Sequence, residues 1–192
     1  SSGSKIALRM ALATLEYHQQ PLVARFSAKV GTIHQRINDE IRELLTNALP
    51  TDDLTQLSES LAKIDKRQID LGQLNSVLEK GNEIDATRLK RLLDIAKSLG
   101  ELHWSLTEGE QGLGRSRYSL VAAPGLNNSW AATYPYNPFQ VPTLVENGGD
   151  APQIAAGLIS AQVRKSNEAI GLLRWAEAEL KKSASKASEQ MH

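Results

Sequence analysis

The strongest structural signal in the chain is Phe26-Ser-Ala-Lys-Val-Gly-Thr-Ile-His-Gln-Arg-Ile-Asn-Asp-Glu-Ile-Arg-Glu-Leu-Leu-Thr-Asn-Ala48, in which apolar residues recur at steps of four and three. The recurring residues are Phe26, Val30, Ile33, Ile37, Ile41, Leu44 and Ala48. A helix of 3.6 residues per turn places them all on one face, while charged residues such as Arg36 and Glu40 occupy the other. The stretch therefore predicts a long amphipathic helix over 22–48, whose narrow stripe is also typical of a coiled-coil seam.

Similar periodicity on both sides of this stretch predicts further helices. One covers 5–19 and stops or bends at Pro21, because proline removes a helical hydrogen bond. Capping residues and leucine spacing predict the others, over 51–64, 70–81, 86–106 and 153–182. We expect a mainly α fold, an antiparallel helical bundle with a small strand-and-loop region, and thus of the α+β type.

The expected organisation follows from these elements. Residues 1–4 are typical of a remnant left by an expression tag. Residues 5–108 form the helical bundle, and residues 109–152 form a glycine- and proline-rich strand and loop region. Residues 153–182 form a helix that packs back, with Ile154, Leu158, Ile159, Val163, Ile170, Leu173 and Leu180 on its inward face. Residues 183–192 form a polar, flexible tail.

One β-strand is expected, over Arg117–Ala123. Because a single strand is not stable by itself, it needs a partner. Either a second strand lies within 140–145, or the strand pairs with another chain or with a part of the protein outside this sequence. The remainder of 124–149 shows no clear periodicity.

Composition limits the classes of function. The 22 basic and 22 acidic residues balance to a net charge of +0, so nothing in the charge favours a nucleic acid or an anionic membrane. The absence of cysteine excludes disulfides, thiolate metal sites and a cysteine nucleophile within the chain. The four histidines are scattered, so no metal site and no catalytic residues are predicted. We expect a cytoplasmic protein.

A glycine-rich segment before the predicted strand is the one candidate for ligand binding. Gly112 and Gly114 are followed by Arg115 and Arg117, and backbone N–H groups with arginines can hold a phosphate. However, phosphate-binding loops follow a strand and open a helix, and here the order is reversed. A flexible connector is therefore the favoured interpretation.

An aromatic stretch, Tyr134-Pro-Tyr-Asn-Pro-Phe-Gln-Val-Pro142, is the most distinctive string in the chain. Three prolines stiffen it, and its aromatic rings need a surface to cover. It is either a rigid loop over the helices or a segment that docks on another domain. The residues predicted to make such contacts are Trp130, Tyr134, Tyr136 and Phe139.

Over residues 115–182 the order of features resembles the thiamine-diphosphate-binding domain of pyruvate and other 2-oxoacid:ferredoxin (flavodoxin) oxidoreductases. The segments concerned are Tyr118-Ser-Leu-Val-Ala-Ala-Pro, Gly125-Leu-Asn-Asn-Ser-Trp-Ala, the stretch 134–142 and Asn147-Gly-Gly-Asp-Ala-Pro-Gln-Ile-Ala. They match the family's strand, its Gly-Cys-Ser-Ser-Ile-Trp-Gly turn, its proline-rich loop and the approach to its next helix. In the family the cysteine of that turn holds an iron–sulfur cluster, whereas Leu126 stands here and cannot ligate iron.

The resemblance implies a non-catalytic segment of such an oxidoreductase, a helical scaffold that contacts other domains or subunits. It implies no cofactor in this chain, since the magnesium and diphosphate motif would lie beyond residue 192. Thiamine diphosphate, Mg²⁺ and an iron–sulfur cluster are then expected only in a larger parent protein. Two alternatives stay open: a stand-alone coiled-coil-like interaction module that uses the stripe of 26–48, and a binder of phosphate ligands.

Overall fold

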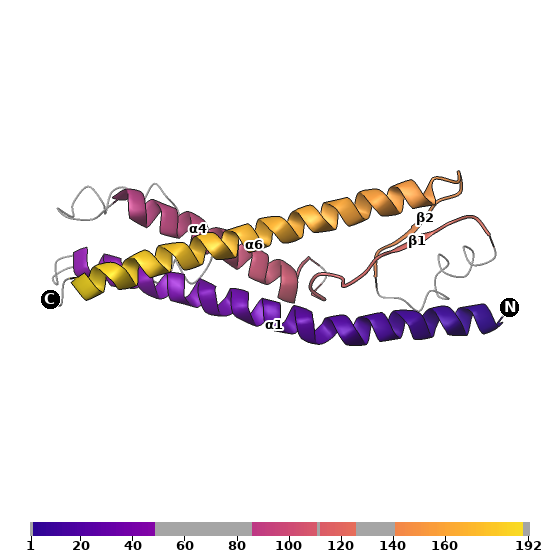
Figure 1. Cartoon of the computed structure of the whole chain (residues 1–192), viewed down its shortest axis with the longest axis horizontal. Coiled ribbons are helices and arrows are strands. Elements are labelled where there is room, and N and C mark those ends of the chain that lie inside the picture. The colour runs from indigo at the N-terminus through magenta and orange to yellow at the C-terminus, as the bar shows by residue number, and fades with distance from the viewer. Residues whose placement is uncertain (1, 49–85, 111, 126–140, 190–192) are drawn as a thin grey trace. The chain divides into compact units, whose positions relative to one another are not determined.

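The computed structural model describes residues 2–48, 86–110, 112–125 and 141–189. The elements follow in the order α1 (Ser2–Ala48), α4 (Ala86–Thr107), β1 (Leu120–Ala122), β2 (Thr143–Val145) and α6 (Ala151–Glu189) (Figure 1). The prediction of a mainly α fold with a small strand region is confirmed. The helices predicted over 51–64 and 70–81 lie outside the described residues. No helix in the described part of the chain is long and apolar enough to cross a membrane.

The chain divides into two compact units. The first comprises Ser1–Ala28 and Trp104–Ala169, and the second comprises Lys29–His103 and Ile170–His192. Each long helix contributes one part to each unit.

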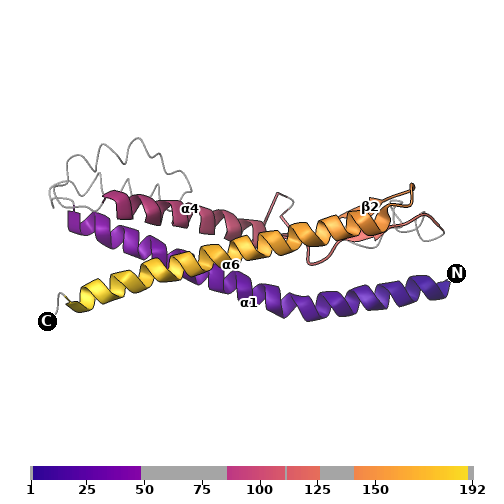
Figure 2. The same ribbon diagram turned by 45° about the horizontal axis from the view of Figure 1, so that its top comes forward.

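In the second unit, α1 and α4 lie side by side and antiparallel (Figures 1 and 2). Arg88 Nη2 lies 2.6 Å from Glu40 Oε1, and a Cβ placed on Gly31 would lie 3.1 Å from the imidazole Nε2 of His103. These residue pairs run in opposite directions along the two helices, as antiparallel packing requires. Gly31 therefore allows a close approach between α1 and α4 that a larger residue would obstruct.

The predicted stripe of α1 is the main contributor to this unit's core. Val30, Ile33, Ile37 and Ile41 are all buried. From α4 the core receives Leu89, Leu92, Leu93, Ile95, Ala96 and Leu99, and from α6 it receives Leu173, Ala176 and Leu180. These residues of the predicted stripe are thus buried within the single chain.

The part of α6 in the second unit is tied to α1 by an exposed ion pair. Lys29 Nζ lies 2.9 Å from Glu177 Oε1, and the hydrogen bond from Lys29 is the main reason why the pKa of Glu177 is lowered. α1 and α6 run in the same chain direction in this unit (Figure 2). Of the helices described in this unit, α4 is antiparallel to α1 and α6 is parallel to it.

The first unit contains a two-stranded parallel sheet. Leu120 pairs with Thr143, Val121 with Leu144 and Ala122 with Val145. The Leu120 N–H donates to Pro142 O at 3.0 Å, and the Glu146 N–H donates to Ala122 O at 3.0 Å. Of the alternatives left open by the sequence, the second strand within 140–145 is confirmed. Both strands have three residues, so β1 is shorter than the predicted 117–123.

Helix α1 continues through Pro21. Of the two possibilities given by the sequence, a helix that stops at Pro21 is therefore wrong. Proline removes the N–H that would bond to the carbonyl of Tyr17, but it leaves the other helical hydrogen bonds intact. Residues 5–19 and 22–48 thus form one helix. Ser2, Gly3 and Ser4 also belong to α1, although the sequence predicts a tag remnant over 1–4.

Two predictions for α6 were wrong. The helix continues to Glu189, so the tail expected to be flexible is helical over 183–189. Its predicted inward face is also only partly buried. Leu173 and Leu180 are buried, but the following four residues are exposed: Leu158 at 39%, Ile159 at 65%, Val163 at 55% and Ile170 at 42%. Periodicity located an apolar face, but the described part of the fold does not cover its first half.

Candidate functional site

The glycine segment closes the C-terminal end of α4. Gly109, Gly112 and Gly114 have φ angles of 61°, 70° and 69°, a region that glycine enters at little cost. The N–H of Gly109 donates to Trp104 O at 2.8 Å, and the N–H of Gly114 donates to Glu108 O at 2.6 Å. A Cβ on Gly114 would lie 2.4 Å from Leu106 O. The N–H of Gly109 satisfies a carbonyl in the last turn of α4, and the N–H of Gly114 satisfies the carbonyl of the residue just after this helix, which gives the segment a structural role that needs no ligand.

The two arginines after this segment reach different helices. The Arg115 guanidinium donates to Gln162 Oε1 on α6. Arg117 Nη1 lies 2.8 Å from Glu16 Oε1 on α1, and the two side chains are 30% and 31% exposed. The structure therefore does not bring Arg115 and Arg117 together with Gly112 and Gly114 around one anion.

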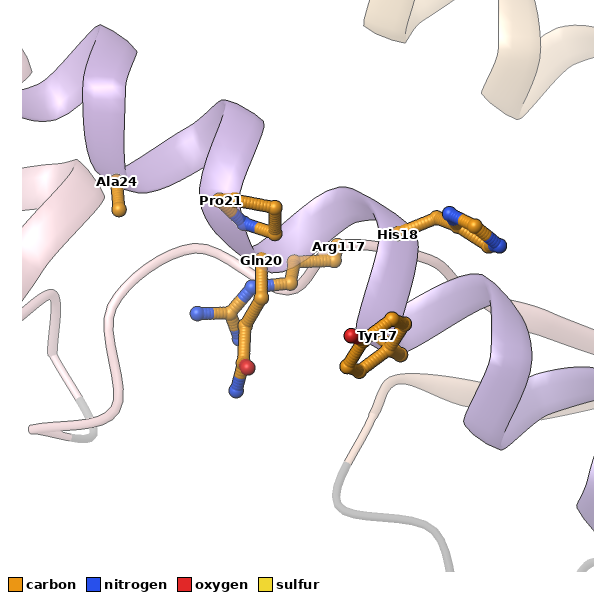
Figure 3. A pocket seen from close by; sticks show the side chains of 6 residues that line it. All are labelled: Tyr17, His18, Gln20, Pro21, Ala24 and Arg117. Carbon is orange, nitrogen blue, oxygen red and sulfur yellow. The ribbon is translucent and has the colours of Figure 1, made fainter.

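A hollow of about 550 Å³ lies beside Arg117 and is lined from α1 by Tyr17, His18, Gln20, Pro21 and Ala24. Figure 3 shows the Gln20 amide and the Arg117 guanidinium on the same side of α1, while the His18 imidazole points away from them (Figure 3). The rings of Tyr17 and His18 make an edge-to-face contact with a centroid distance of 5.7 Å. The hollow thus combines an exposed aromatic ring, an amide and a cation over the small apolar surface of Pro21 and Ala24.

Tyr118 is the neighbour of this hollow along the chain. Burial is the main reason why the pKa of its phenol is raised, and the negative charge of Glu16 raises it further. The phenol therefore stays protonated, and the charged groups beside it are Glu16 and Arg117. Sequence reasoning found Arg117 but missed Glu16, Tyr17 and Gln20, because nothing in the spacing of residues 16–20 shows that the segment 115–118 packs against them.

Glu146 occupies the N-terminal end of α6. Its Oε2 accepts hydrogen bonds from the N–H groups of Gly149 and Asp150, both at 2.8 Å, and its Oε1 accepts one from Gly148. Desolvation alone would raise the pKa of Glu146, but the backbone hydrogen bonds from residues 148–151 together lower it. The N–H groups that could hold an external anion at this helix end are engaged by a carboxylate of the chain itself.

The predicted contact residues Trp130, Tyr134, Tyr136 and Phe139, and also Leu126 of the family-like turn, lie outside the described residues. Within the described ranges, no group of three His, Asp or Glu side chains is placed to hold a metal ion.

Exposed apolar residues gather in the first unit. Of the described Leu, Ile and Val side chains, every buried one belongs to the second unit. The large exposed hydrophobic residues of the first unit are Ile6, Met10, Leu15, Tyr17, Leu22, Leu113, Leu144, Leu158, Ile159 and Val163. The first unit therefore offers apolar surface rather than an apolar interior.

No protein-family model, curated protein or solved structure matches this chain. The likeness to the 2-oxoacid oxidoreductases therefore depends on the quoted residues alone.

Proposed function

We propose that this protein is a helical scaffold without chemistry of its own, and that it associates with a second copy of itself through the outer face of α6 in the first unit. One observation carries this proposal: Ile159 and Val163 are 65% and 55% exposed within a stretch that contains no charged residue. That stretch, 151–163, is Ala-Pro-Gln-Ile-Ala-Ala-Gly-Leu-Ile-Ser-Ala-Gln-Val. We call its exposed side the α6 face.

The α6 face is unlike an ordinary solvated helix surface, which carries charged residues opposite its apolar stripe. Ala156, Ile159 and Val163 follow at steps of three and four, so they lie along one line of the helix. Small neighbours, including Gly157 and Ser160, allow another helix to approach closely. Interface cores are depleted in charge in the same way.

A second copy is the occupant that the charges favour. Apart from Arg115, whose guanidinium donates to Gln162, the α6 face carries no charge, so its own copy meets little repulsion, whereas a charged face would need a partner of opposite sign. The whole chain also has a net charge of +0, so two copies are not separated by long-range repulsion. Two identical faces related by a two-fold axis then make a closed interface. On α1 the exposed residues Ile6 and Met10 are interrupted by Lys5 and Arg9, which makes that helix the weaker candidate.

Light scattering coupled to size-exclusion chromatography tests this proposal. We expect the wild-type chain to form a dimer, and Ile159→Glu to give a monomer with unchanged helical content. Lys165→Glu is the matched control, because it changes a charge on the opposite side of the same helix and should leave the dimer intact. A wild-type chain that stays monomeric at high micromolar concentration would contradict the proposal.

A second candidate, a non-catalytic segment of a 2-oxoacid:ferredoxin-oxidoreductase-like protein, is favoured by the positions of the strands. β1 falls in the segment that resembles the family's strand, and α6 begins within the segment that resembles its approach to a helix. In that case the α6 face contacts another domain or subunit of the parent protein. Thermal-shift titration of the chain with thiamine diphosphate and Mg²⁺ should then give no stabilisation, and tight binding would contradict a non-catalytic role.

A further inference from the structure

The hollow beside Arg117 brings a cavity, a cation and an aromatic side chain together, and the scaffold function uses none of them. Its lining comes from about two turns of α1 and from the segment before β1, all within the first unit. Tyr17 is 75% exposed there, so its ring is available for contact. We call this hollow the Arg117 pocket.

We propose that the Arg117 pocket binds a small aromatic carboxylate. The carboxylate lies against the free donors of the Arg117 guanidinium and the Gln20 amide, and the ring of the ligand lies against Tyr17 and Pro21. This assignment does not depend on whether α6 mediates dimerisation.

The charge of the pocket favours a carboxylate over a phosphate. Arg117 is the one lining residue with a permanent charge, and Glu16 already contacts its Nη1. A guanidinium presents five N–H donors in a planar fork, so one contact with Glu16 leaves donors for a second planar carboxylate. A phosphate dianion would face the negative charge of Glu16 with a single cation to offset it. Arg115, which could have added a second cation, is held on α6 by Gln162.

The size and surface of the pocket favour an aromatic ligand. The hollow has a volume of about 550 Å³ and is largely open to solvent, so a small planar ligand can lie on its lining with one side exposed. Pro21 and Ala24 form an apolar floor, and the ring of Tyr17 provides a flat face for offset stacking. Benzoate is the simplest compound that carries both features.

Titration of the isotope-labelled, full-length chain with benzoate, followed by NMR, tests the assignment. We expect saturable shifts at the side chains of Arg117 and Gln20, and no comparable effect of the uncharged benzamide. Arg117→Gln should weaken benzoate binding by about tenfold or more, since the charge-assisted hydrogen bonds are lost. Arg115→Gln is the matched control and should leave the affinity unchanged.

The effect of Glu16→Gln on benzoate affinity distinguishes a Glu16 that competes for Arg117 from one that only holds the segment in place. Glu16→Gln removes the group that competes for Arg117, so benzoate should bind about two- to fivefold more tightly. If Glu16 only anchors the segment to α1, its removal weakens binding or leaves it unchanged, and the proposal is overturned. Absence of saturation with benzoate, or equal binding of inorganic phosphate, also overturns it. Because Glu16→Gln and Arg115→Gln are read independently, these outcomes stay decisive even if Arg117→Gln fails to fold.

Discussion

Glu146 shows how one side chain can begin a helix from outside it. Asp150 stands directly before α6, as expected for a capping residue, yet the carboxylate that receives the first N–H groups comes from Glu146. Gly149 has a φ of 98°, and a Cβ on Gly148 would lie 2.8 Å from Glu146 Oε1, so these glycines let the backbone wrap around the carboxylate. Residues 146–150 therefore function as one capping unit.

Replacing Glu146 by Gln should loosen the start of α6. The amide has a single acceptor oxygen and no negative charge to interact with the helix dipole. We expect faster hydrogen exchange at the amides of residues 149–151 at neutral pH, compared with wild type and with Glu101→Gln on the exposed side of α4. Unchanged exchange would show that the hydrogen bonds to Glu146 do not hold this helix end.

The pH dependence has a definite sign, because the folded-state pKa of Glu146 is lowered. The carboxylate contributes stability that is fully present above the ordinary glutamate pKa and is lost as the pH falls through the lowered folded value. The difference between wild type and Glu146→Gln should therefore disappear in acid. A difference that grows as the pH falls would contradict this assignment.

Two of the ion pairs of the second unit, Arg88–Glu40 and Lys29–Glu177, should differ in their contribution to stability. The Arg88 and Glu40 side chains are only 11% and 16% exposed, whereas those of Lys29 and Glu177 are 57% and 39% exposed. Arg88→Met removes the cation that pairs with the mostly buried Glu40 carboxylate, and we expect a loss of about 3 kcal/mol in the free energy of unfolding. Lys29→Met should cost much less, because solvent screens an exposed pair. Urea denaturation of both variants measures the difference, and equal losses would refute it.

At the scale of elements, Pro21 changes α1 without ending it. The helix has enough hydrogen bonds and enough buried surface beyond residue 29 to continue across one missing donor. The carbonyl of Tyr17 lacks its helical partner as a result, and this residue also lines the Arg117 pocket. Pro21 therefore removes one hydrogen bond within α1 and does not form a boundary between two helices.

Pro21→Ala should stabilise α1, because alanine restores the hydrogen bond to Tyr17 O. An interior proline costs a helix about 3 kcal/mol relative to alanine, and the freer unfolded chain offsets part of that gain. We expect a net increase of about 2 kcal/mol in the free energy of unfolding, measured by circular dichroism in urea. A decrease would show that the backbone around residue 21 is adapted to proline and cannot accept alanine.

At the scale of the whole chain, buried and exposed apolar residues are separated between the two units. The second unit has an ordinary interior built around Ile37 and Ile41, both 0% exposed. The first unit has no buried Leu, Ile or Val among its described residues and is joined by polar links such as Arg117–Glu16. A unit of this kind gains stability when another surface covers it, which agrees with the proposed association.

Two isoleucine substitutions should distinguish these roles. Ile37→Ala removes a fully buried side chain, and we expect it to cost about 2–5 kcal/mol in the free energy of unfolding. Ile159→Ala changes a side chain that is 65% exposed, so its cost should stay within about 0.5 kcal/mol at concentrations where the chain is monomeric. Thermal and urea unfolding under those conditions check both values. A large cost for Ile159→Ala would mean that the α6 face is covered within the chain.

Sequence periodicity predicted the bounds of the helices far better than it predicted which of their apolar faces are buried. It placed α4 within a residue of its observed ends, and it identified the stripe of 30–41 that fills the core. It failed at Ile159 and Val163, which follow the same spacing as buried residues. A helical pattern shows which residues share a face, but it contains no information on whether another segment covers that face.

For the candidate site, the sequence predicted that one group is formed by Gly112, Gly114, Arg115 and Arg117. In the structure these residues contact three different helices. The glycines close α4, Arg115 reaches α6 and Arg117 reaches α1. The connector bends at residues 115 and 117 and is not an extended strand there, so the two arginine side chains reach different helices. The ion pair between Arg117 and Glu16 brings the connector to α1, which explains why Gln20 and Arg117, far apart in the chain, line one hollow.

By itself, the sequence determined the helical character of this protein, the place of its strands and the absence of cysteine chemistry, because these depend on local spacing and composition. Only the tertiary structure decided that the two strands pair in parallel, that the stripe of α1 is buried within its own chain, and that Ile159 and Val163 of α6 are exposed. Those outcomes depend on contacts between distant segments, whose energies no local pattern encodes.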